Sequence, residues 1–253
     1  DPASVVHYPV MAGGSFDRRL DNEAAAQAAL LAREAGRPVQ VVWSRLEEQL
    51  RDPVRNPAHL RMAAVVTQSG QISAWSAKIA APPSGIEFGH RLLDGLAPHD
   101  ALTQAGEQAD AMMVDGAWPI YAIPNVAVDH HPAAIGLPTG RLRGNAAAIH
   151  AFAIESFIDE LASRNDREPL SYRMAMLGHD PRMAACLTQV AEQAGWDGGL
   201  DNSGQGLACF AMQGGRIAVI ATARRDEGGV RVDRLSACVD IGRIVNPDIA
   251  RQQ

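Results

Sequence analysis

Two adjacent glycines, Gly13 and Gly14, limit the local structures that the start of this chain can adopt. They lie in "VMAGGSFDRRLDNE", residues 10–23, between an apolar run and an alanine-rich stretch. Glycine lets backbone N–H groups approach a ligand closely, and the first turn of a helix carries partial positive charge. Arg18 and Arg19 add cationic donors. The stretch therefore predicts either an anion-binding loop or an ordinary strand-to-helix turn with solvated arginines.

Strand and helix signals surround this loop. Residues 4–11 are expected to form a strand that enters the loop, and residues 22–35 an alanine-rich helix that ends at Gly36. Residues 37–43, "RPVQVVW", are rich in β-forming residues and are expected to form a second strand. Together these segments predict a βαβ-like unit.

The rest of the chain mixes hairpins with helices. Two alternating apolar runs flank Ser69-Gly70 and predict a hairpin over 59–80, whereas 82–119 is expected to be an irregular surface excursion with a weak helix near 100–113. Later elements are expected as a strand at 125–131, helices at 146–163, 169–177 and 181–195, with Asp180 as the cap of the last helix, and strands at 206–212, 216–225 and 230–239.

This order predicts an α+β fold with mixed sheets and packed helices. The glycine-rich stretch 195–206 is the best candidate boundary, so we expect a first lobe over 1–195 and the start of a second over 196–253. In the helix 146–163 the spacing predicts that one stripe faces the core and that acidic residues lie opposite. The stripe consists of Ile149, Phe152, Ala153, Phe157 and Leu161, and the opposite face carries Glu155, Asp159 and Ser163.

Composition excludes several classes of function. The formal net charge of −6 argues against general nucleic-acid binding. The three cysteines are far apart in sequence and form no CxxC, so buried apolar thiols are expected rather than a zinc or iron–sulfur site. His130 and His131 are adjacent on an expected strand and therefore point to opposite sides, which disfavours a shared metal.

A second arginine-bearing loop precedes the helix at 146–163. In "GRLRGNAAAIHAFAIE", residues 140–155, Arg141 and Arg143 come before Gly144 and Asn145. The arrangement again predicts an anion site at a helix start, with solvated arginines as the alternative. A serine hydrolase built on Ser15 is a weaker alternative, because Asp17 replaces the second glycine of a G-x-S-x-G elbow.

Four stretches carry a resemblance to a known family. They are "AGGSFDRRLDNEAAAQAALLAREAGRPVQVVWSRLEE" at 12–48, "YAIPN" at 121–125, "AFAIESFIDELA" at 151–162 and "DIGRIVNPDIARQQ" at 240–253. In this order they resemble the molybdopterin-binding subunit of the xanthine dehydrogenase/aldehyde oxidase family. The branch that they resemble contains isoquinoline 1-oxidoreductase beta subunits and membrane-bound aldehyde dehydrogenases.

The resemblance implies a fold and a chemistry. It implies α+β lobes around molybdopterin, a molybdenum–pterin cofactor, in the cytosine dinucleotide form. It implies oxidation of aldehydes or N-heterocycles with oxygen derived from water, and transfer of electrons to a small iron–sulfur [2Fe-2S] subunit and onward to an acceptor such as a cytochrome. It also implies a periplasmic or membrane-associated setting, and it identifies the chain as an internal fragment that is inactive alone.

The resemblance assigns roles to individual residues. The matched cofactor-binding positions are Gly13, Gly14, Ser15, Phe16, Asp17, Arg18, Arg143, Gly144, Asn145 and Gln253. No catalytic residue and no metal ligand are assigned. The glutamate base of the family belongs to a Gly-Glu motif that is expected after residue 253.

Both cofactor loops depart from the pattern of the family. Ser15 and Asp17 stand where the first loop has glycine, and the negative charge of Asp17 would repel an anionic cofactor. The second loop of the family reads Arg-Ser-Val-Gly-His-Ser. In this chain Arg143 matches the arginine, but the next five residues differ, with alanines at 146–148. A degenerate, non-catalytic family member that acts as a scaffold or assembly subunit is therefore the alternative function.

Overall fold

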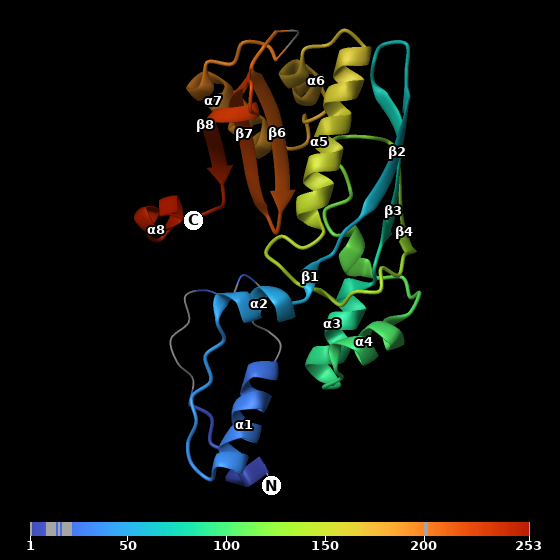
Figure 1. Ribbon diagram of the computed structural model, residues 1–253. Helices are drawn as coiled ribbons and strands as arrows, with labels where there is room; N and C mark the ends of the chain where they lie inside the picture. Colours follow the sequence, from blue (N-terminus) through green and yellow to red (C-terminus); the bar gives the residue numbers. More distant parts are fainter. Residues whose placement is uncertain (1, 9–13, 15, 17–21, 200–201, 253) are drawn as a thin grey trace. The chain divides into compact units, whose positions relative to one another are not determined.

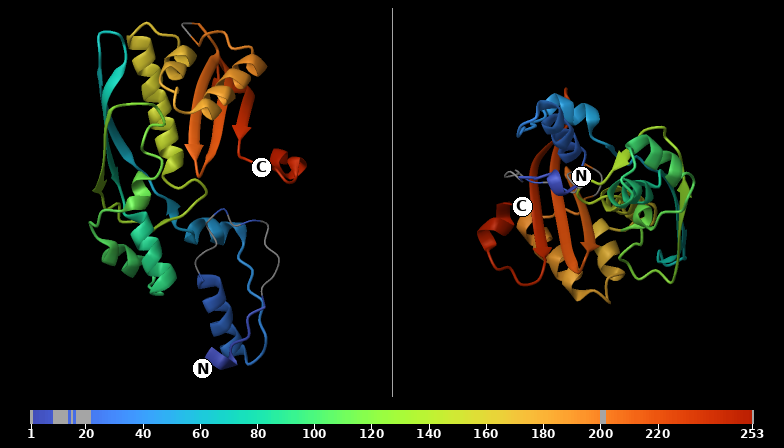
Figure 2. Two further views of the ribbon diagram at one scale, coloured as in Figure 1. Left: turned by 180° about the vertical axis from the view of Figure 1, so that it is seen from behind. Right: turned by 90° about the horizontal axis from the view of Figure 1, so that it is seen from below.

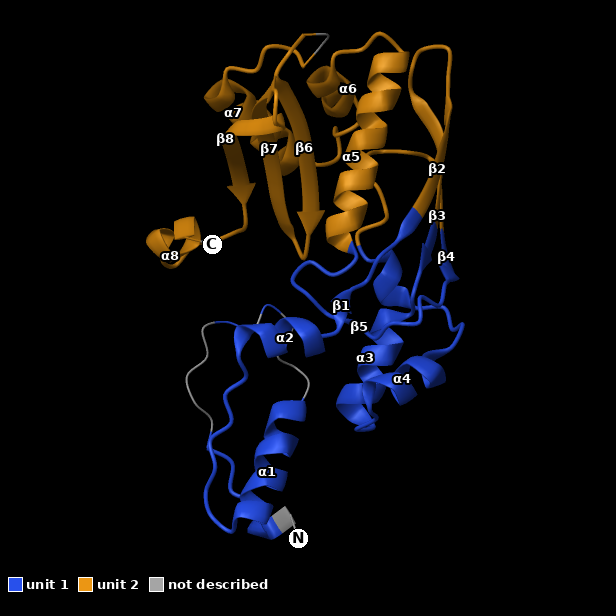
Figure 3. Ribbon diagram, viewed as in Figure 1, with its two compact units in different colours: residues 1–59, 79–115, 129–146 blue, residues 60–78, 116–128, 147–253 orange. Residues whose placement is uncertain are grey.

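The computed structural model describes residues 2–8, 14, 16, 22–199 and 202–252 (Figure 1). The chain divides into two compact units, and each is discontinuous in sequence (Figure 3). The first contains residues 1–59, 79–115 and 129–146, and the second contains 60–78, 116–128 and 147–253. The expected boundary near residue 195 lies inside the second unit, and the division into lobes 1–195 and 196–253 stays a prediction.

Helices and short sheets alternate irregularly along the chain. Strands β1 and β5 pair in parallel, β2, β3 and β4 form a three-stranded sheet in that order, and β6, β7 and β8 form an antiparallel sheet. The mixture of small sheets and packed helices confirms the predicted α+β class. No helix in the described part of the chain is long and apolar enough to cross a membrane. The elements are η1 Pro2–Ser4, α1 Glu23–Ala35, α2 Arg45–Arg51, β1 Val54–Arg55, β2 His59–Val66, β3 Ile72–Ala81, α3 Ser84–Leu93, α4 Pro98–Ala105, η2 Ala111–Val114, β4 Asn125–Pro132, β5 Thr139–Gly140, α5 Ala147–Arg164, α6 Pro169–Ala175, α7 Pro181–Ala194, β6 Gln205–Met212, β7 Gly215–Asp226, β8 Gly229–Asp240 and α8 Pro247–Gln252.

The βαβ-like unit predicted at the start of the chain is not formed by the described residues. Helix α1 is where it was expected, and Gly36 ends it in a left-handed conformation with φ of 61°. However, residues 5–8 and 37–43 are not strands, so the expected strands 4–11 and 37–43 are wrong over these residues. A β-rich sequence forms a strand only where a neighbouring strand supplies hydrogen bonds, and none of the described residues does so here.

The segment 82–119 contains the helices α3, α4 and η2, which corrects the predicted irregular excursion, although the weak helix expected near 100–113 overlaps α4. Helix α3 begins after Pro83, and its first N–H groups are capped by a distant side chain. The Asp110 carboxylate accepts hydrogen bonds from the Gly85 N–H at 2.6 Å and from the Ile86 N–H at 3.3 Å. Because the cap comes from 24 or 25 residues further along the chain, no local sequence pattern could reveal this helix start.

Helix α5 is the centre of the second unit. It lies between β6 on one side and β2 on the other when seen from the front and from behind (Figure 1 and Figure 2). Its Ile154, Ile158 and Leu161 pack in one core with Trp75 of β3 and Leu207 of β6. A helix that packs on two sides needs apolar residues over a wide part of its surface. The single apolar stripe predicted for this helix is narrower than that.

The prediction of which face of α5 is buried is partly wrong. Phe152, placed in the apolar stripe, is 75% exposed, whereas Glu155, placed on the solvent face, is 4% exposed. Leu161 is buried as predicted. The spacing of apolar residues did not predict burial of Glu155, because it treats every carboxylate as exposed to solvent. The partners that compensate for burial of Glu155 are distant in sequence.

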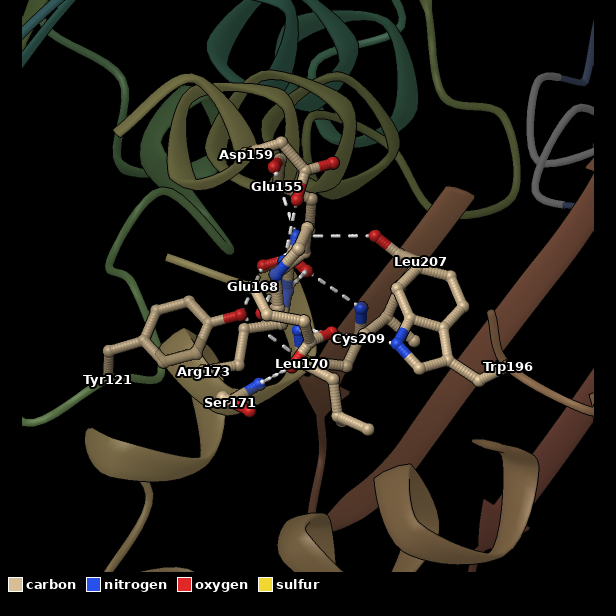
Figure 4. Close-up of polar contacts among 11 residues, drawn as sticks. Tyr121, Glu155, Asp159, Glu168, Leu170, Ser171, Arg173, Trp196, Leu207 and Cys209 are labelled. Atoms are coloured by element: carbon tan, nitrogen blue, oxygen red, sulfur yellow. Dashed lines mark hydrogen bonds and ion pairs between the residues drawn. The ribbon is translucent and has the colours of Figure 1, made fainter. Parts of the chain in front are cut away.

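Glu155 is buried against the guanidinium of Arg173 on α6 (Figure 4). The Arg173 Nε atom lies 3.0 Å from Glu155 Oε2, and its Nη1 atom lies 2.6 Å from Asp159 Oδ1. The Tyr121 hydroxyl donates to Glu155 Oε1 at 2.7 Å, and the Cys209 N–H donates to Oε2 at 2.9 Å. The Glu155–Arg173 hub, these five residues, therefore connects α5, α6, β6 and the segment before β4.

Burial and charge set the protonation of the hub. Burial raises the pKa of Asp159, against the attraction of Arg173. Burial beside Glu155 raises the pKa of Tyr121 well above its ordinary value, and burial also raises the pKa of the Cys209 thiol. Burial opposes the charge of Arg173, but Glu155, Tyr121 and Asp159 together outweigh burial and raise the Arg173 pKa. Tyr121 and Cys209 therefore stay protonated, and we assign the hub a structural role.

Glu168 supports the start of α6. Its carboxylate accepts hydrogen bonds from the Leu170 N–H at 2.8 Å, from the Ser171 N–H at 2.6 Å and from Trp196 Nε1 at 2.7 Å. Partial burial opposes the charge, but the bonds from Ser171, Trp196 and Leu170 outweigh it and lower the Glu168 pKa. The carboxylate is therefore an ionised helix cap at neutral pH.

Replacing Arg173 with methionine should strongly destabilise the second unit. The change leaves the Glu155 carboxylate buried without its cation, which typically lowers the free energy of unfolding by about 3–5 kcal/mol. Urea unfolding followed by circular dichroism measures this loss. Arg164→Met at the exposed end of α5 is the matched control. A surface change of this kind usually alters stability by less than about 0.5 kcal/mol. Equal effects of the two changes would contradict the structural role of the hub.

Replacing Glu168 with alanine should remove a helix cap and lower the free energy of unfolding at neutral pH by roughly 1 kcal/mol. Because the folded pKa of Glu168 is below its ordinary value of 4.5, its stabilisation is complete above that pH and is lost as the pH falls through the folded pKa. The difference between Glu168→Ala and the unmodified protein should therefore shrink on acidification. Glu160→Ala, exposed on α5, should show neither effect, and a difference that persists at acid pH would argue against an ionised cap.

Candidate functional site

The two glycine-bearing loops meet in the first unit. The backbone N–H of Arg143 donates a hydrogen bond to the carbonyl oxygen of Phe16 at 2.8 Å. Both residues belong to the same compact unit, although they come from distant parts of the sequence. The contact joins the two segments that sequence analysis singled out independently as anion-receptive.

The first loop turns sharply at its described residues. Gly14 has φ of 111° and Phe16 has φ of 52°, both in the left-handed region. A Cβ atom on Gly14 would also lie 2.9 Å from Cε2 of the Phe16 ring. The backbone conformation therefore favours glycine at position 14, and any larger residue would also displace the Phe16 ring. Positive φ at a phenylalanine is uncommon and is characteristic of constrained, functional loops.

The second loop is closed by its own turn and held by Arg55. Gly144 and Asn145 have φ of 81° and 38°, and the Asn145 N–H donates to the Leu142 carbonyl at 2.7 Å. Arg55 Nη1 donates to the carbonyl of Asn145 and Nη2 to the carbonyl of Arg143, each at 3.2 Å. Because Arg55 binds two carbonyls of one loop, it fixes the path of the backbone and leaves the Arg143 side chain exposed.

A buried carboxylate anchors the strand that leads into this loop. Glu87 on α3 accepts hydrogen bonds from the Thr139 N–H at 2.9 Å and from the Thr139 hydroxyl at 2.6 Å. Arg91 Nη1 donates to Glu87 Oε1 and to the Thr139 carbonyl, each at 2.8 Å. Burial raises the pKa of Glu87, against the bonds from Thr139 and the charge of Arg91. This Glu87–Arg91–Thr139 anchor fixes β5, which pairs with β1 so that Arg55 lies opposite Gly140.

Arg141 has a different role from Arg143. Its Cζ atom lies 5.6 Å from the centre of the Phe88 ring, and the Cζ atom of Arg91 lies 5.8 Å from the same centre. These are cation–π distances. Of the two arginines predicted for the second loop, Arg141 therefore packs on α3, and Arg143 is the one that remains exposed near the first loop.

The structure brings together half of the predicted site residues in the first unit. The described ones are Gly14, Phe16, Arg143, Gly144 and Asn145, whereas Gly13, Ser15, Asp17, Arg18 and Gln253 lie outside the described residues. Sequence reasoning missed Arg55, Glu87 and Thr139. Arg55 contacts loop residues 88 and 90 positions away, so no motif or spacing could identify it.

His130 and His131 point to different sides of β4, as predicted. His130 Nδ1 accepts a hydrogen bond from the Asp110 N–H at 3.0 Å, and its Nε2 lies 3.0 Å from the Ala81 carbonyl, so Nε2 carries the proton. His131 is exposed. Among residues 2–8, 14, 16, 22–199 and 202–252, no group of three or more His, Cys, Asp or Glu side chains could hold a metal ion.

The chemistry of the joined loops fits an anionic group. Left-handed glycines allow close approach of the backbone, and exposed Arg143 supplies a guanidinium that suits phosphate. Asn145 adds an amide that can donate or accept hydrogen bonds. The described residues therefore fit a phosphate-bearing ligand held by both loops.

Comparison with known proteins agrees with this chemistry. Residues 3–87 match the family model of the molybdopterin cofactor-binding domain. The chain is 30% identical to the isoquinoline 1-oxidoreductase subunit beta of Brevundimonas diminuta, over 98% of this chain and 31% of that protein. The chain is thus similar to a molybdopterin cofactor-binding domain and to the beta subunit of an isoquinoline oxidoreductase. The resemblance identified from the sequence motifs is thereby confirmed.

Further comparisons extend over nearly all of the chain. It is 27% identical to the membrane-bound aldehyde dehydrogenase of Gluconacetobacter polyoxogenes, over 99% of this chain and 35% of that protein. The chain thus spans about a third of the length of these curated relatives. The crystal structure of quinoline 2-oxidoreductase from Pseudomonas putida 86 superposes with a TM-score of 0.57 at 16% identity, over 85% of this chain and 28% of that one, which shows that the two chains share a fold.

Replacing Arg55 with methionine should loosen the second loop without unfolding the unit. Loss of both bonds to loop carbonyls should increase the hydrogen-exchange rates of the amides of residues 142–146 by about tenfold, as expected for loss of roughly 1.5 kcal/mol of local stability. Hydrogen exchange with mass spectrometry measures this change. Arg33→Met, at an exposed arginine of α1, is the control and should leave these amides unchanged. Equal exchange in the Arg55 variant and the unmodified protein would show that Arg55 does not hold the loop.

Proposed function

We propose that this chain forms part of the molybdopterin-binding subunit of a molybdenum hydroxylase that oxidises aldehydes or N-heterocycles with oxygen derived from water. The observation that carries the proposal is the hydrogen bond between the Arg143 N–H and the Phe16 carbonyl. It joins the two loops that the family resemblance assigns to one cofactor, which supports a common site. Two relatives, an isoquinoline oxidoreductase and an aldehyde dehydrogenase, support both substrate classes.

The residues of this chain bind and orient the cofactor in this proposal. Backbone groups of Gly14 and Phe16 face it from the first loop, and Arg143 donates charge-assisted hydrogen bonds to its phosphates. Gly144 and Asn145 complete the second loop. The proposed site also includes Gly13, Ser15, Asp17, Arg18 and Gln253. The cofactor is molybdopterin, in the cytosine dinucleotide form, and it supplies the oxidation chemistry when bound.

The same proposal includes partners. Electrons leave through a small [2Fe-2S] subunit and then reach an acceptor such as a cytochrome, as the resemblance implies. The general base is a glutamate in a Gly-Glu motif of the full-length subunit, so residues 1–253 contribute binding and not proton transfer. A periplasmic setting stays a prediction of the resemblance.

A non-catalytic scaffold is the second candidate function. The observation that favours it is the burial of Ala146 and Ala147, each 2% exposed, where the family loop carries Gly-His. Two buried methyl groups leave this part of the loop without side-chain donors for a cofactor. The replacement of family glycines by Ser15 and Asp17 in the first loop also favours a non-catalytic scaffold. Retention of cofactor by the full-length protein separates the two functions.

The test is the molybdenum and pterin content of the full-length subunit, coexpressed with its small iron–sulfur subunit and purified as a complex. An enzyme should hold near-stoichiometric molybdenum and should oxidise aldehydes or N-heterocycles. Arg143→Ala should weaken cofactor retention by roughly 10- to 100-fold, because charge-assisted hydrogen bonds contribute about 1.5–3 kcal/mol. Arg33→Ala is the control for loss of one exposed arginine and should retain the cofactor.

Two outcomes would contradict the proposal in different ways. A correctly assembled complex that contains no molybdenum and no pterin would favour the scaffold. Full cofactor retention by Arg143→Ala would remove the second loop from the site while leaving the family assignment intact.

A further inference from the structure

Helix α7 and strand β8 run side by side in the second unit, and side-chain contacts fix their alignment. Near one end, Arg182 of α7 makes a paired contact with Asp240 of β8, with Nε–Oδ2 and Nη2–Oδ1 distances of 2.7 Å each. Near the other end, Arg234 Nη2 donates to the Gln193 carbonyl at 2.9 Å. The Arg182 hydrogen bond lowers the pKa of Asp240 to about 2, so the first contact stays charged at ordinary pH.

This alignment places two cysteines opposite each other. Cys186 follows Arg182 by four residues on α7, and Cys238 precedes Asp240 by two residues on β8, on the same face of the strand. Four residues of a helix and two residues of a strand advance by nearly the same distance, roughly 6 Å. Since both elements advance equally from the Arg182–Asp240 contact, Cys186 and Cys238 lie at the same level of α7 and β8.

Side-chain contacts agree with this placement. Cys238 Sγ donates to Gln189 Oε1 at 3.1 Å, and Gln189 lies three residues after Cys186, on the same face of α7. Both cysteines are free thiols, with Cys186 buried and Cys238 partly exposed. Burial and the neighbouring Cys238 raise the pKa of Cys186 to about 11.

The third cysteine provides an internal control. Cys209 belongs to the Glu155–Arg173 hub, where it is buried and lies 3.4 Å from the Tyr121 hydroxyl. It is on β6, and β7 lies between β6 and β8 in the sheet. Cys209 should therefore stay reduced under conditions that oxidise a pair on α7 and β8.

We propose that Cys186 and Cys238 are a modification site, a dithiol that an oxidant of the peroxide class converts into a reversible disulfide linking α7 to β8. The more accessible Cys238 reacts first: its thiolate sulfur attacks one peroxide oxygen, the O–O bond breaks and a sulfenic acid forms. The Cys186 sulfur then attacks the Cys238 sulfur, the S–O bond breaks, and the Cys186 proton leaves with the oxygen as water. In total, two thiols and one hydrogen peroxide give one disulfide and two waters.

The experiment treats the folded chain with hydrogen peroxide and counts thiols after denaturation. The count should fall from three to one per chain. Digestion with trypsin and a glutamate-specific protease gives the fragments 183–192, 193–216 and 235–243, which separate the three cysteines. Without reduction, 183–192 and 235–243 should appear as one linked species that dithiothreitol separates. The oxidised protein should also melt at a higher temperature, because the link restricts the unfolded chain.

Single variants complete the test. Cys186→Ser and Cys238→Ser should each abolish the linked species, whereas Cys209→Ser should retain it. Cys238 is partly exposed, so Cys238→Ser is informative even where Cys186→Ser does not fold. The proposal is overturned if Cys238 proceeds to sulfinic acid while Cys186 stays a thiol, or if the disulfide forms only between two chains. A link from Cys238 to Cys209 would overturn it as well.

Discussion

The ion pair between Glu155 and Arg173 is the interaction on which the second unit depends. An ionised group inside a protein is strongly unfavourable unless charge and hydrogen bonds compensate for the lost water. The donors that compensate Glu155 come from α6, β6 and Tyr121, so they are supplied only when these segments pack on α5 in one arrangement. We infer that the pair selects this arrangement, while the surrounding apolar core supplies most of the stability.

The first unit uses the same principle to position its loops. Glu87 is fully buried on α3, and its donors come from Arg91 and from Thr139 of β5. Strand β5 leads directly into the second loop, so fixing β5 fixes the start of that loop. Arg55 of the paired strand β1 donates hydrogen bonds to two carbonyls of the loop. The exposed Arg143 is thus connected through hydrogen bonds and a short strand to a carboxylate in the interior. Pre-organisation of this kind is what a phosphate-binding loop requires, because a loose loop would lose affinity through ordering.

Local sequence signals predicted the elements whose causes are local. The turn at Ser69-Gly70, the Asp180 cap of α7 and the end of α1 at Gly36 each depend on residues within a few positions, and each was found where expected. Failures occurred where the cause is distant. The start of α3 needs Asp110, and the buried face of α5 needs Arg173. For the candidate site, the motifs located both loops, but only the fold revealed that Arg55, Glu87 and Thr139 hold them in place.

Cysteine trapping measures whether the loops at Phe16 and Arg143 lie against each other in the folded chain. The Arg143 nitrogen lies 2.8 Å from the Phe16 carbonyl oxygen. Standard bond lengths then limit the separation of the two Cα atoms to about 6.7 Å, within the range that a disulfide spans. In the double variant Phe16→Cys, Arg143→Cys, mild oxidation should link the tryptic fragments 1–18 and 142–164. The same variant unfolded in urea is the control and should form this link far more slowly. Absence of the link in the folded chain, with both thiols still reactive, would contradict a common site for the two loops.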